Sequence, residues 1–244
     1  AGMVPFCNIY SSFMQRAYDN VIHDVAIQDL PVVMCLDRGG LVGADGVTHH
    51  GVFDMAAFGA VPGLTIAAPM DELELRNMMY TGLQYGHPFM IRYPRGNGAG
   101  RRWRGVPFEA LPVGRGRRLR EGTDVALVTV GTVGNAAARA AERAAAKGVS
   151  VAHYDLRFAK PLDEALLAGV GAEFRHVVTV EDGSLRGGVG EAVTAFFNAR
   201  GCEVAVHSLG IGDEWVEHGT PGQLYALCGY DEEGILRALL DTRA

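Results

Sequence analysis

The chain has 244 residues, of which 48% are hydrophobic and 20% are charged, and its formal net charge is −6. A chain of this size can bury one large core or two modest ones without disulfides or metal ions. The negative balance argues against a general nucleic-acid-binding role. No apolar run approaches the ~20 residues that a membrane-spanning helix needs, and the start, AGMVPFCN, lacks the pattern of a signal peptide.

The four cysteines are scattered along the chain, and no two of them form a CxxC pair. Three of them lie in apolar runs, where a free cysteine behaves as a small hydrophobic residue. We therefore expect a reduced, cytoplasmic protein without a cysteine-based metal site. The cysteines are Cys7, Cys35, Cys202 and Cys228.

The first part of the chain alternates short apolar runs with helical patterns. Residues 31–36 (PVVMCL) form a continuous apolar run, which is typical of a strand covered on both faces. Asp71 and Glu72 suit the N-terminus of a helix, and Ala17, Val21 and Val25 recur at helical spacing. The pattern predicts strands at 7–10, 31–36, 64–67 and 89–93, and helices at 16–28, 54–60 and 71–83.

An arginine-rich stretch follows, with Trp103 within it. Its weak periodicity and its Gly, Arg and Pro content favour a connecting segment over residues ~97–119. A basic cluster with an aromatic residue is also compatible with binding RNA or phosphate. The arginines are Arg101, Arg102, Arg104, Arg115, Arg117, Arg118 and Arg120.

The second part repeats the alternation. Residues 124–130 (DVALVTV) read as a buried strand, and an Ala-rich helix follows Gly131 and ends at Lys147, before Gly148. Further strands are predicted at 149–154, 176–180 and 203–207, and further helices at 161–167, 191–199 and 232–240. Strands that alternate with helices indicate parallel sheets covered on both faces. We expect an α/β fold of two consecutive domains, residues 1–97 and 120–244, joined by a linker over 98–119.

In open parallel sheets, ligands bind beyond the carboxyl ends of the strands. Tyr10, Arg38 and Arg95 each stand at or just beyond the end of a predicted strand of the first sheet. Two arginines that converge on one crevice favour a phosphate or carboxylate ligand, because the guanidinium fork matches those oxygens. The alternative is that each arginine pairs with a local acid, with Asp37 the obvious partner of Arg38.

The loop after residues 31–36 is rich in glycine and carries two adjacent histidines, His49 and His50. Imidazole is the side chain best suited to move protons near neutral pH. A histidine in such a loop is a better functional candidate than one on a helix face, such as His23. The pattern alone does not rank His49 against His50.

Long motifs then resemble one known family. Residues 9–54 (IYSSFMQRAYDNVIHDVAIQDLPVVMCLDRGGLVGADGVTHHGVFD) resemble the pyrimidine-binding domain of the 1-deoxy-D-xylulose-5-phosphate synthase family, in the transketolase superfamily. The same family is indicated by PMDELELRNMMY at 69–80, IRYPRGN at 91–97 and LGIGDEWVEHGT at 209–220. The glycine-rich stretch that begins with Glu181 and Asp182 resembles the transketolase C-terminal domain, which implies a role in dimer packing.

The resemblance implies a transferase dependent on thiamine diphosphate and Mg²⁺. Pyruvate and D-glyceraldehyde 3-phosphate would condense with loss of CO2 to give 1-deoxy-D-xylulose 5-phosphate, a precursor of isoprenoids, thiamine and pyridoxal phosphate. Matched by motif, Phe13 would stack on the aminopyrimidine of the cofactor with Arg16 beside it, and Tyr10, Arg38 and Arg95 would hold the substrate phosphate. Asp45 and His49 would face the reacting carbons, with His49 assisting proton transfer and His50 its neighbour.

Two features of that family have no counterpart in this sequence. The Gly-Asp-Gly motif that binds the diphosphate through Mg²⁺ does not occur, and neither does the glutamate that activates the aminopyrimidine. The family places that glutamate just upstream of an Ala-Gly-Met segment like the one formed here by Ala1, Gly2 and Met3. We therefore expect a fragment or one chain of a split enzyme, which works as a homodimer with the N-terminal part and has no synthase activity alone.

Two other functions stay open at this point. One is a β-type subunit of a split transketolase or of a 2-oxoacid dehydrogenase, which needs a separate partner chain. The other is a non-catalytic phosphate or RNA binder that uses the arginine-rich stretch. A partner chain with the Gly-Asp-Gly motif would favour the first, and salt-dependent binding to polynucleotide would favour the second.

Overall fold

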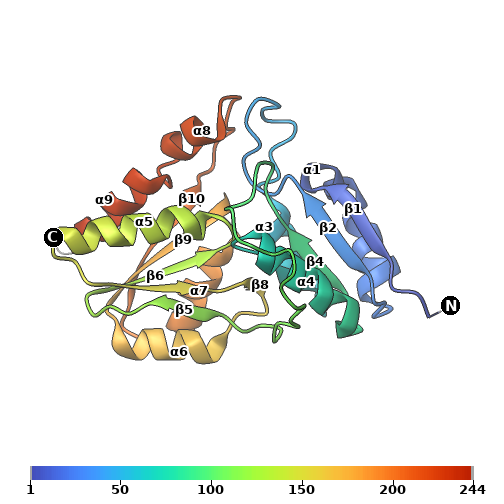
Figure 1. The fold of residues 1–244 in the computed structure, drawn as a ribbon, viewed down its shortest axis with the longest axis horizontal. Helices are drawn as coiled ribbons and strands as arrows, with labels where there is room; N and C mark the ends of the chain where they lie inside the picture. The colour runs from blue at the N-terminus through green and yellow to red at the C-terminus, as the bar shows by residue number, and fades with distance from the viewer. Residues whose placement is uncertain (1, 243–244) are drawn as a thin grey trace.

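The computed structural model describes residues 2–242, which form two five-stranded sheets placed side by side (Figure 1). The first sheet has the order β1-β2-β4-β3-β8 and the second has the order β10-β9-β6-β7-β5. Four strands of each sheet are parallel, and the remaining edge strand, β8 or β5, is antiparallel. The predicted α/β class with two mostly parallel sheets is confirmed.

The strands of the first sheet lie where the apolar runs predicted them, with boundary shifts of no more than two residues. Its central strand β2 alternates its side chains between two apolar layers, with Val33 and Cys35 on one face and Met34 and Leu36 on the other. The strands are β1 (Phe6–Tyr10), β2 (Val33–Asp37), β3 (Thr65–Ala67) and β4 (Phe89–Arg92).

The helices of the first domain also follow the prediction, with one difference. The helix predicted at 16–28 begins earlier and is made of four short pieces that include a 3-10 turn and a π-helical turn. They are α1 (Ser11–Met14), η1 (Gln15–Ala17), α2 (Tyr18–Asn20) and η2 (Val21–Ala26). The others are α3 (Asp54–Gly59) and α4 (Glu72–Tyr85). Asp71 caps α4, because its side chain accepts from the Glu74 N–H at 2.9 Å.

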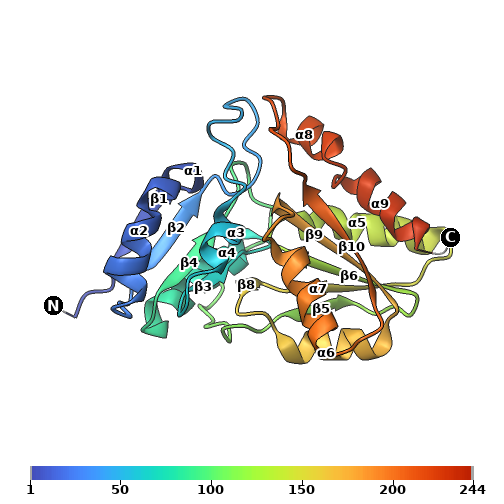
Figure 2. The ribbon, with the colours of Figure 1, turned by 180° about the vertical axis from the view of Figure 1, so that it is seen from behind.

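The second sheet is covered by helices on both faces, as Figures 1 and 2 show from opposite sides. Val125 and Leu127 of β6 pack toward α5 and α9, while Ala126 and Val128 pack toward α6 and α7. The strands are β6 (Val125–Val130), β7 (Val151–Asp155), β9 (His176–Ser184) and β10 (Ala205–Ile211). The helices are α5 (Val133–Ala146), α6 (Glu164–Glu173), α7 (Val189–Ala199) and α9 (Glu232–Asp241).

One helix and two strands escaped the sequence analysis. The helix is α8 (Pro221–Leu227), where Thr220 and Gln223 form a capping box that precedes only a short apolar pattern. The strands are β5 (Arg117–Arg120), inside and just beyond the predicted linker, and β8 (Phe158–Lys160). Both are three- or four-residue antiparallel edges, too short for a period-2 pattern to be visible.

Strand β8 links the two halves of the chain, because it follows β7 in sequence but pairs with β3 of the first sheet. Phe158 is fully buried there and packs edge-on against Phe89 of β4, with ring centroids 6.3 Å apart. The second part of the chain therefore completes the first core, so the two sheets are not independent units.

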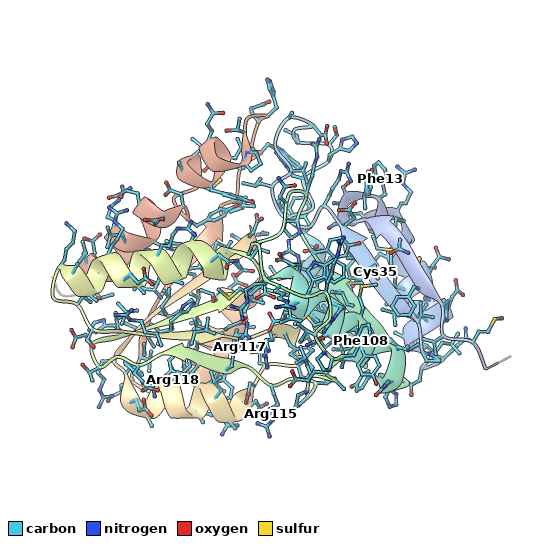
Figure 3. All side chains as sticks on the ribbon, in the orientation of Figure 1. Phe13, Cys35, Phe108, Arg115, Arg117 and Arg118 are labelled. Atoms are coloured by element: carbon cyan, nitrogen blue, oxygen red, sulfur yellow. The ribbon has the colours of Figure 1, made fainter. Side chains whose placement is uncertain are left out.

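Several arginines of the arginine-rich stretch pair with carboxylates, among them Arg115, Arg117 and Arg118, which are labelled in Figure 3. Arg117 lies within 3.0 Å of Glu74 and 2.9 Å of Asp155, so it bridges the two domains. Arg115 pairs with Asp163, Arg118 with Glu121 and Glu173, and Arg101 with Asp71. Four of the seven arginines of the stretch, Arg101, Arg115, Arg117 and Arg118, are thus paired with carboxylates.

A buried ion pair of the first domain also contacts the second domain. Arg92, at the end of β4, donates from Nε to Asp54 Oδ2 at 2.9 Å, and both side chains are almost fully buried. Its Nη2 donates to the main-chain carbonyl of Asp182 in β9 at 2.8 Å. Ser11 of α1 also donates to Asp54 Oδ2, at 2.9 Å. One guanidinium therefore connects strand β4, helices α1 and α3, and the second sheet.

Among the helices of residues 2–242, none combines the length and the apolar character required of a membrane span.

We expect Phe158→Ala to lower the free energy of unfolding by about 3–5 kcal/mol, because it opens a cavity in the core that β8 closes. Urea denaturation followed by circular dichroism measures this change. The matched control is Phe108→Ala, whose ring is 62% exposed, and we expect it to cost less than about 1 kcal/mol. Equal losses for the two variants would contradict the role given to β8.

We expect Asp54→Ala to lower the free energy of unfolding by about 3–5 kcal/mol, because it leaves the Arg92 guanidinium buried without its counter-charge. The control is Glu164→Ala, which removes the exposed partner of Arg200 and should cost less than about 1 kcal/mol. The double variant Asp54→Leu with Arg92→Met should regain part of the loss. An Asp54→Ala variant as mild as Glu164→Ala would contradict the account.

Candidate functional site

The candidate site lies beyond the carboxyl ends of β1, β2 and β4. The parallel register pairs Tyr10 with Asp37 and Leu36 with Arg92, so these three strands end at nearly the same level. The residues that follow them are α1, the loop 38–51 and the segment 93–99. Three chain segments that are distant in sequence thus meet at one edge of the first sheet.

Four of the predicted site residues form one continuous row of contacts. The Arg38 guanidinium carbon lies 3.8 Å from the centroid of the Tyr10 ring. Phe13 stacks against Tyr10, with ring centroids 5.2 Å apart and an interplanar angle of 26°. His49 meets Phe13 edge-on, with ring centroids 5.5 Å apart. A cation, two aromatic rings and an imidazole are therefore placed together by β1, α1 and the loop 38–51.

Arg38 takes an uncommon backbone conformation to reach this position. Its φ angle is +61°, which costs an L-residue roughly 1–2 kcal/mol. Asp37 compensates, since Oδ1 accepts from the Arg38 main-chain N–H at 2.7 Å and Oδ2 accepts from Nη1 at 2.9 Å. The predicted local pairing with Asp37 thus exists. It leaves Arg38 Nε buried without a protein partner.

Arg95 and Asp45 form a second pair beside this row. Arg95 Nη1 donates to Asp45 Oδ2 at 2.9 Å and to the Val42 carbonyl at 3.4 Å. Both side chains of the pair are more than a third exposed. Arg95 and Tyr93 also line a hollow of about 690 Å³ that extends between α4, α5 and α9. Tyr10, Phe13, Arg38 and His49 do not line that hollow, so Arg95 stands between the two regions.

The two adjacent histidines have different surroundings. His50 is buried; its Nδ1 accepts from the Val42 N–H at 3.1 Å, and its Nε2 lies 3.4 Å from the Glu217 carbonyl. Both ring nitrogens of His50 are therefore used within the scaffold. His49 is half-exposed beside Phe13, and its Nδ1 lies 2.9 Å from Thr48 Oγ1. Of the two, His49 is the one with a face open to a ligand.

Arg16 is not part of the row of contacts. It lies in η1, is exposed, and its guanidinium makes no hydrogen bond or ion pair with another described residue. Phe13, by contrast, is 42% exposed although it is an aromatic residue packed between two rings. The neighbouring Ser12 Oγ is buried without a partner. The exposed ring of Phe13 fits a flat heterocycle such as an aminopyrimidine.

The buried residues Arg92, Glu181 and Asp182 have shifted pKa values. Burial raises the pKa of Asp182, and burial likewise raises the pKa of Glu181 to about 7. Burial on its own would lower the pKa of Arg92, but Asp54, Asp182 and Glu181 outweigh it and raise that pKa. The guanidinium therefore stays charged, and the surrounding acids offset the effect of its burial.

Sequence reasoning missed this buried layer. Asp54 was noticed only as the start of a short helix, and Arg92 only as part of an apolar strand. A charged residue inside an otherwise apolar strand was the available signal, because arginine is rarely buried unless it is paired. Nothing in the local sequence pointed to Asp182 as its partner across the interface.

Among residues 2–242, no three or more His, Cys, Asp or Glu side chains are grouped so that they could hold a metal ion.

Comparison with known proteins yields two family models that together span most of the chain. Residues 1–100 match the pyrimidine-binding domain of transketolase, and residues 114–235 match the transketolase C-terminal domain. A solved structure described as a split gene transketolase, inactive beta4 tetramer, superposes with a TM-score of 0.86 and 26% identity. The match covers 99% of this chain and 77% of that one.

Among curated proteins, a 1-deoxy-D-xylulose-5-phosphate synthase from Bacteroides fragilis is 59% identical over 99% of this chain. The corresponding protein of Anaeromyxobacter sp. is 49% identical over 97% of the chain. In both cases the chain spans 38% of the length of the relative. With both domain models matched in order, and with the relatives resembling the whole chain, this chain belongs to the transketolase family.

Proposed function

We propose that the chain supplies the pyrimidine-binding and acceptor-binding part of a thiamine-diphosphate-dependent 1-deoxy-D-xylulose-5-phosphate synthase. The observation that carries the proposal is the row Arg38–Tyr10–Phe13–His49 at the strand ends of the first sheet. It combines an open aromatic face with a cation and a proton-transfer group. The identity with synthases along the whole chain supports this choice of reaction.

The reaction joins two substrates with loss of one carbon. The bond between the carboxylate and the carbonyl carbon of pyruvate breaks, and CO2 leaves. A new bond forms between that carbonyl carbon and the aldehyde carbon of D-glyceraldehyde 3-phosphate, whose oxygen takes up one proton and becomes a hydroxyl. Thiamine diphosphate, when bound, supplies the electron sink that such a decarboxylation needs.

The side chains of this chain would divide the remaining work. Phe13 offers its exposed ring face to the aminopyrimidine, and Arg16 lies one helical turn further along. Arg38 and Arg95, with the Tyr10 hydroxyl, hold the phosphate of the acceptor, because guanidinium groups match its oxygens and its charge. To do this, Arg95 exchanges its bond with Asp45 for one with the phosphate.

His49 would then deliver the proton to the acceptor oxygen. Its ring contacts the Thr48 hydroxyl and the Phe13 ring. Release of Asp45 from Arg95 would leave a carboxylate near the reacting carbons. A positioned imidazole of this kind contributes roughly 10²–10⁴-fold to a proton-transfer step.

The diphosphate and Mg²⁺ would be held by a polypeptide segment outside this sequence. Neither a Gly-Asp-Gly motif nor a metal-binding group among the described residues is available for them. We infer that the working unit combines this chain with such a segment and pairs as a homodimer, in keeping with the tetramer of β chains named for the split-gene relative. A cytoplasmic location remains part of this proposal.

A second candidate is the β-type subunit of a split transketolase or of a 2-oxoacid dehydrogenase. The observation in its favour is the superposition on a split-gene transketolase over nearly the whole chain. The two candidates differ in their donor and product. The synthase releases CO2 from pyruvate and makes the sugar phosphate. A transketolase takes a two-carbon unit from a ketose phosphate without releasing CO2. The dehydrogenase transfers its acyl group to an acceptor other than the aldehyde.

We expect the chain alone to show no turnover of pyruvate and D-glyceraldehyde 3-phosphate with thiamine diphosphate and Mg²⁺. Addition of the part of the Bacteroides fragilis relative that this chain does not match should restore CO2 release and formation of the five-carbon product. The measurement is CO2 release together with mass spectrometry of the product.

Three results would count against the proposal. Full turnover by the isolated chain would show that no further segment is needed. Activity of the mixture with a ketose phosphate donor, or CO2 release without the five-carbon product, would favour the second candidate. A stable mixture without activity on any of these donors would exclude both.

A further inference from the structure

The loop 38–51 carries three of the proposed site residues but has little regular structure of its own. Its two ends are closed by Gly40 and Gly51, which exchange main-chain hydrogen bonds of 2.7 and 2.8 Å. Between them the chain makes only short turns, such as the bond from the Gly46 N–H to the Gly43 carbonyl. Packing from outside must therefore set where Arg38, Asp45 and His49 lie.

Asp182 supplies such a contact from the second domain. It lies within the buried part of β9, and its side chain is almost fully buried. Oδ1 accepts from the Leu41 main-chain N–H at 3.0 Å, across 141 residues of sequence. The same carboxylate accepts from the hydroxyls of Tyr230 at 2.8 Å and Tyr225 at 3.4 Å. The two tyrosines orient the carboxylate, and the carboxylate in turn holds the start of the loop.

The shape of the loop is fitted to this carboxylate. Gly40 has a φ angle of +84°, and a Cβ atom at that position would lie 2.0 Å from Asp182 Oδ2. The loop backbone therefore passes against the carboxylate at a distance that only glycine allows. Any outward movement of Asp182 would leave the Leu41 amide buried and unpaired, which is costly.

Other contacts from the second domain hold the rest of the loop. The Gly219 N–H donates to the Gly43 carbonyl at 3.4 Å, and His50 Nε2 lies 3.4 Å from the Glu217 carbonyl. In both Figure 1 and Figure 2 the loop after β2 lies beside the segment that precedes α8. The second domain, to which we assign no catalytic group, thus contacts the loop at Leu41, Gly43 and His50.

We propose that Asp182 is a positioning residue of the active site, which sets the geometry of the acceptor-binding loop 38–51 from the C-terminal domain. This proposal rests on the proposed function, because the loop matters only if its side chains bind the acceptor. It gives the C-terminal domain an indirect part, through the loop 38–51, in binding the phosphate-bearing aldehyde, in addition to packing between subunits.

The test uses the variants Asp182→Ala and Asp182→Asn in the full chain. The matched control is Asp163→Ala, another buried aspartate of the same domain, which caps α6 through the Leu166 N–H and does not contact the loop. Amide hydrogen exchange of each variant is followed by mass spectrometry. Steady-state kinetics are then measured after mixing with the complementary part of the Bacteroides fragilis relative.

We expect Asp182→Ala to speed exchange of the amides at 40–51 by about 10- to 100-fold, because one hydrogen bond to a charged group is lost. The KM for D-glyceraldehyde 3-phosphate should rise by a similar factor, while the KM for pyruvate stays within about two-fold. Asp182→Asn keeps an acceptor oxygen and should recover most of both effects. Asp163→Ala should lower thermal stability without changing exchange in the loop or the ratio of the two KM values.

Unchanged exchange at 40–51 in a folded Asp182→Ala variant would overturn the proposal. Equal rises in both KM values, or the same effects in Asp163→Ala, would also overturn it, because they would reflect general loss of stability. A wild-type mixture without synthase activity would refute the proposed function instead, and the exchange data would still decide whether Asp182 sets the loop.

Discussion

The buried guanidinium of Arg92 is the constraint on which the arrangement of the site depends. A charge removed from water must be compensated, so Asp54 and the Asp182 carbonyl have to stay within hydrogen-bond distance of it. Asp54 also accepts from Ser11, two residues before Phe13. Through this one cation, the end of β4, the first turn of α1 and the second domain are fixed relative to one another.

This arrangement explains why the site needs both domains although its side chains come from the first. In the row of Arg38, Tyr10, Phe13 and His49, Phe13 is exposed and the other three side chains are half-buried. The backbone around this row is held by hydrogen bonds that connect the two domains. They involve Arg92, Asp182, and His50 with the segment before α8. A rigid scaffold of this kind keeps binding groups in place without filling the space that a ligand needs.

Much of this architecture could be predicted from the sequence. Continuous apolar runs such as PVVMCL indicated covered parallel strands, and strand-end reasoning placed Tyr10, Arg38 and Arg95 at one edge of the sheet. The antiparallel edges β5 and β8 were missed because three or four residues carry too little periodicity. The Asp54–Arg92–Asp182 layer was missed because its members are 38 to 128 residues apart and interact only after both domains have formed.

The most direct test of the account compares two acceptors that differ only in the phosphate. In the reconstituted enzyme, kcat/KM is measured for D-glyceraldehyde 3-phosphate and for D-glyceraldehyde, in the wild type and in Arg38→Ala and Arg95→Ala. The account predicts that each variant lowers kcat/KM for the phosphorylated acceptor by roughly 10- to 100-fold and leaves the unphosphorylated one nearly unchanged. Equal losses for both acceptors would contradict a phosphate site at these strand ends.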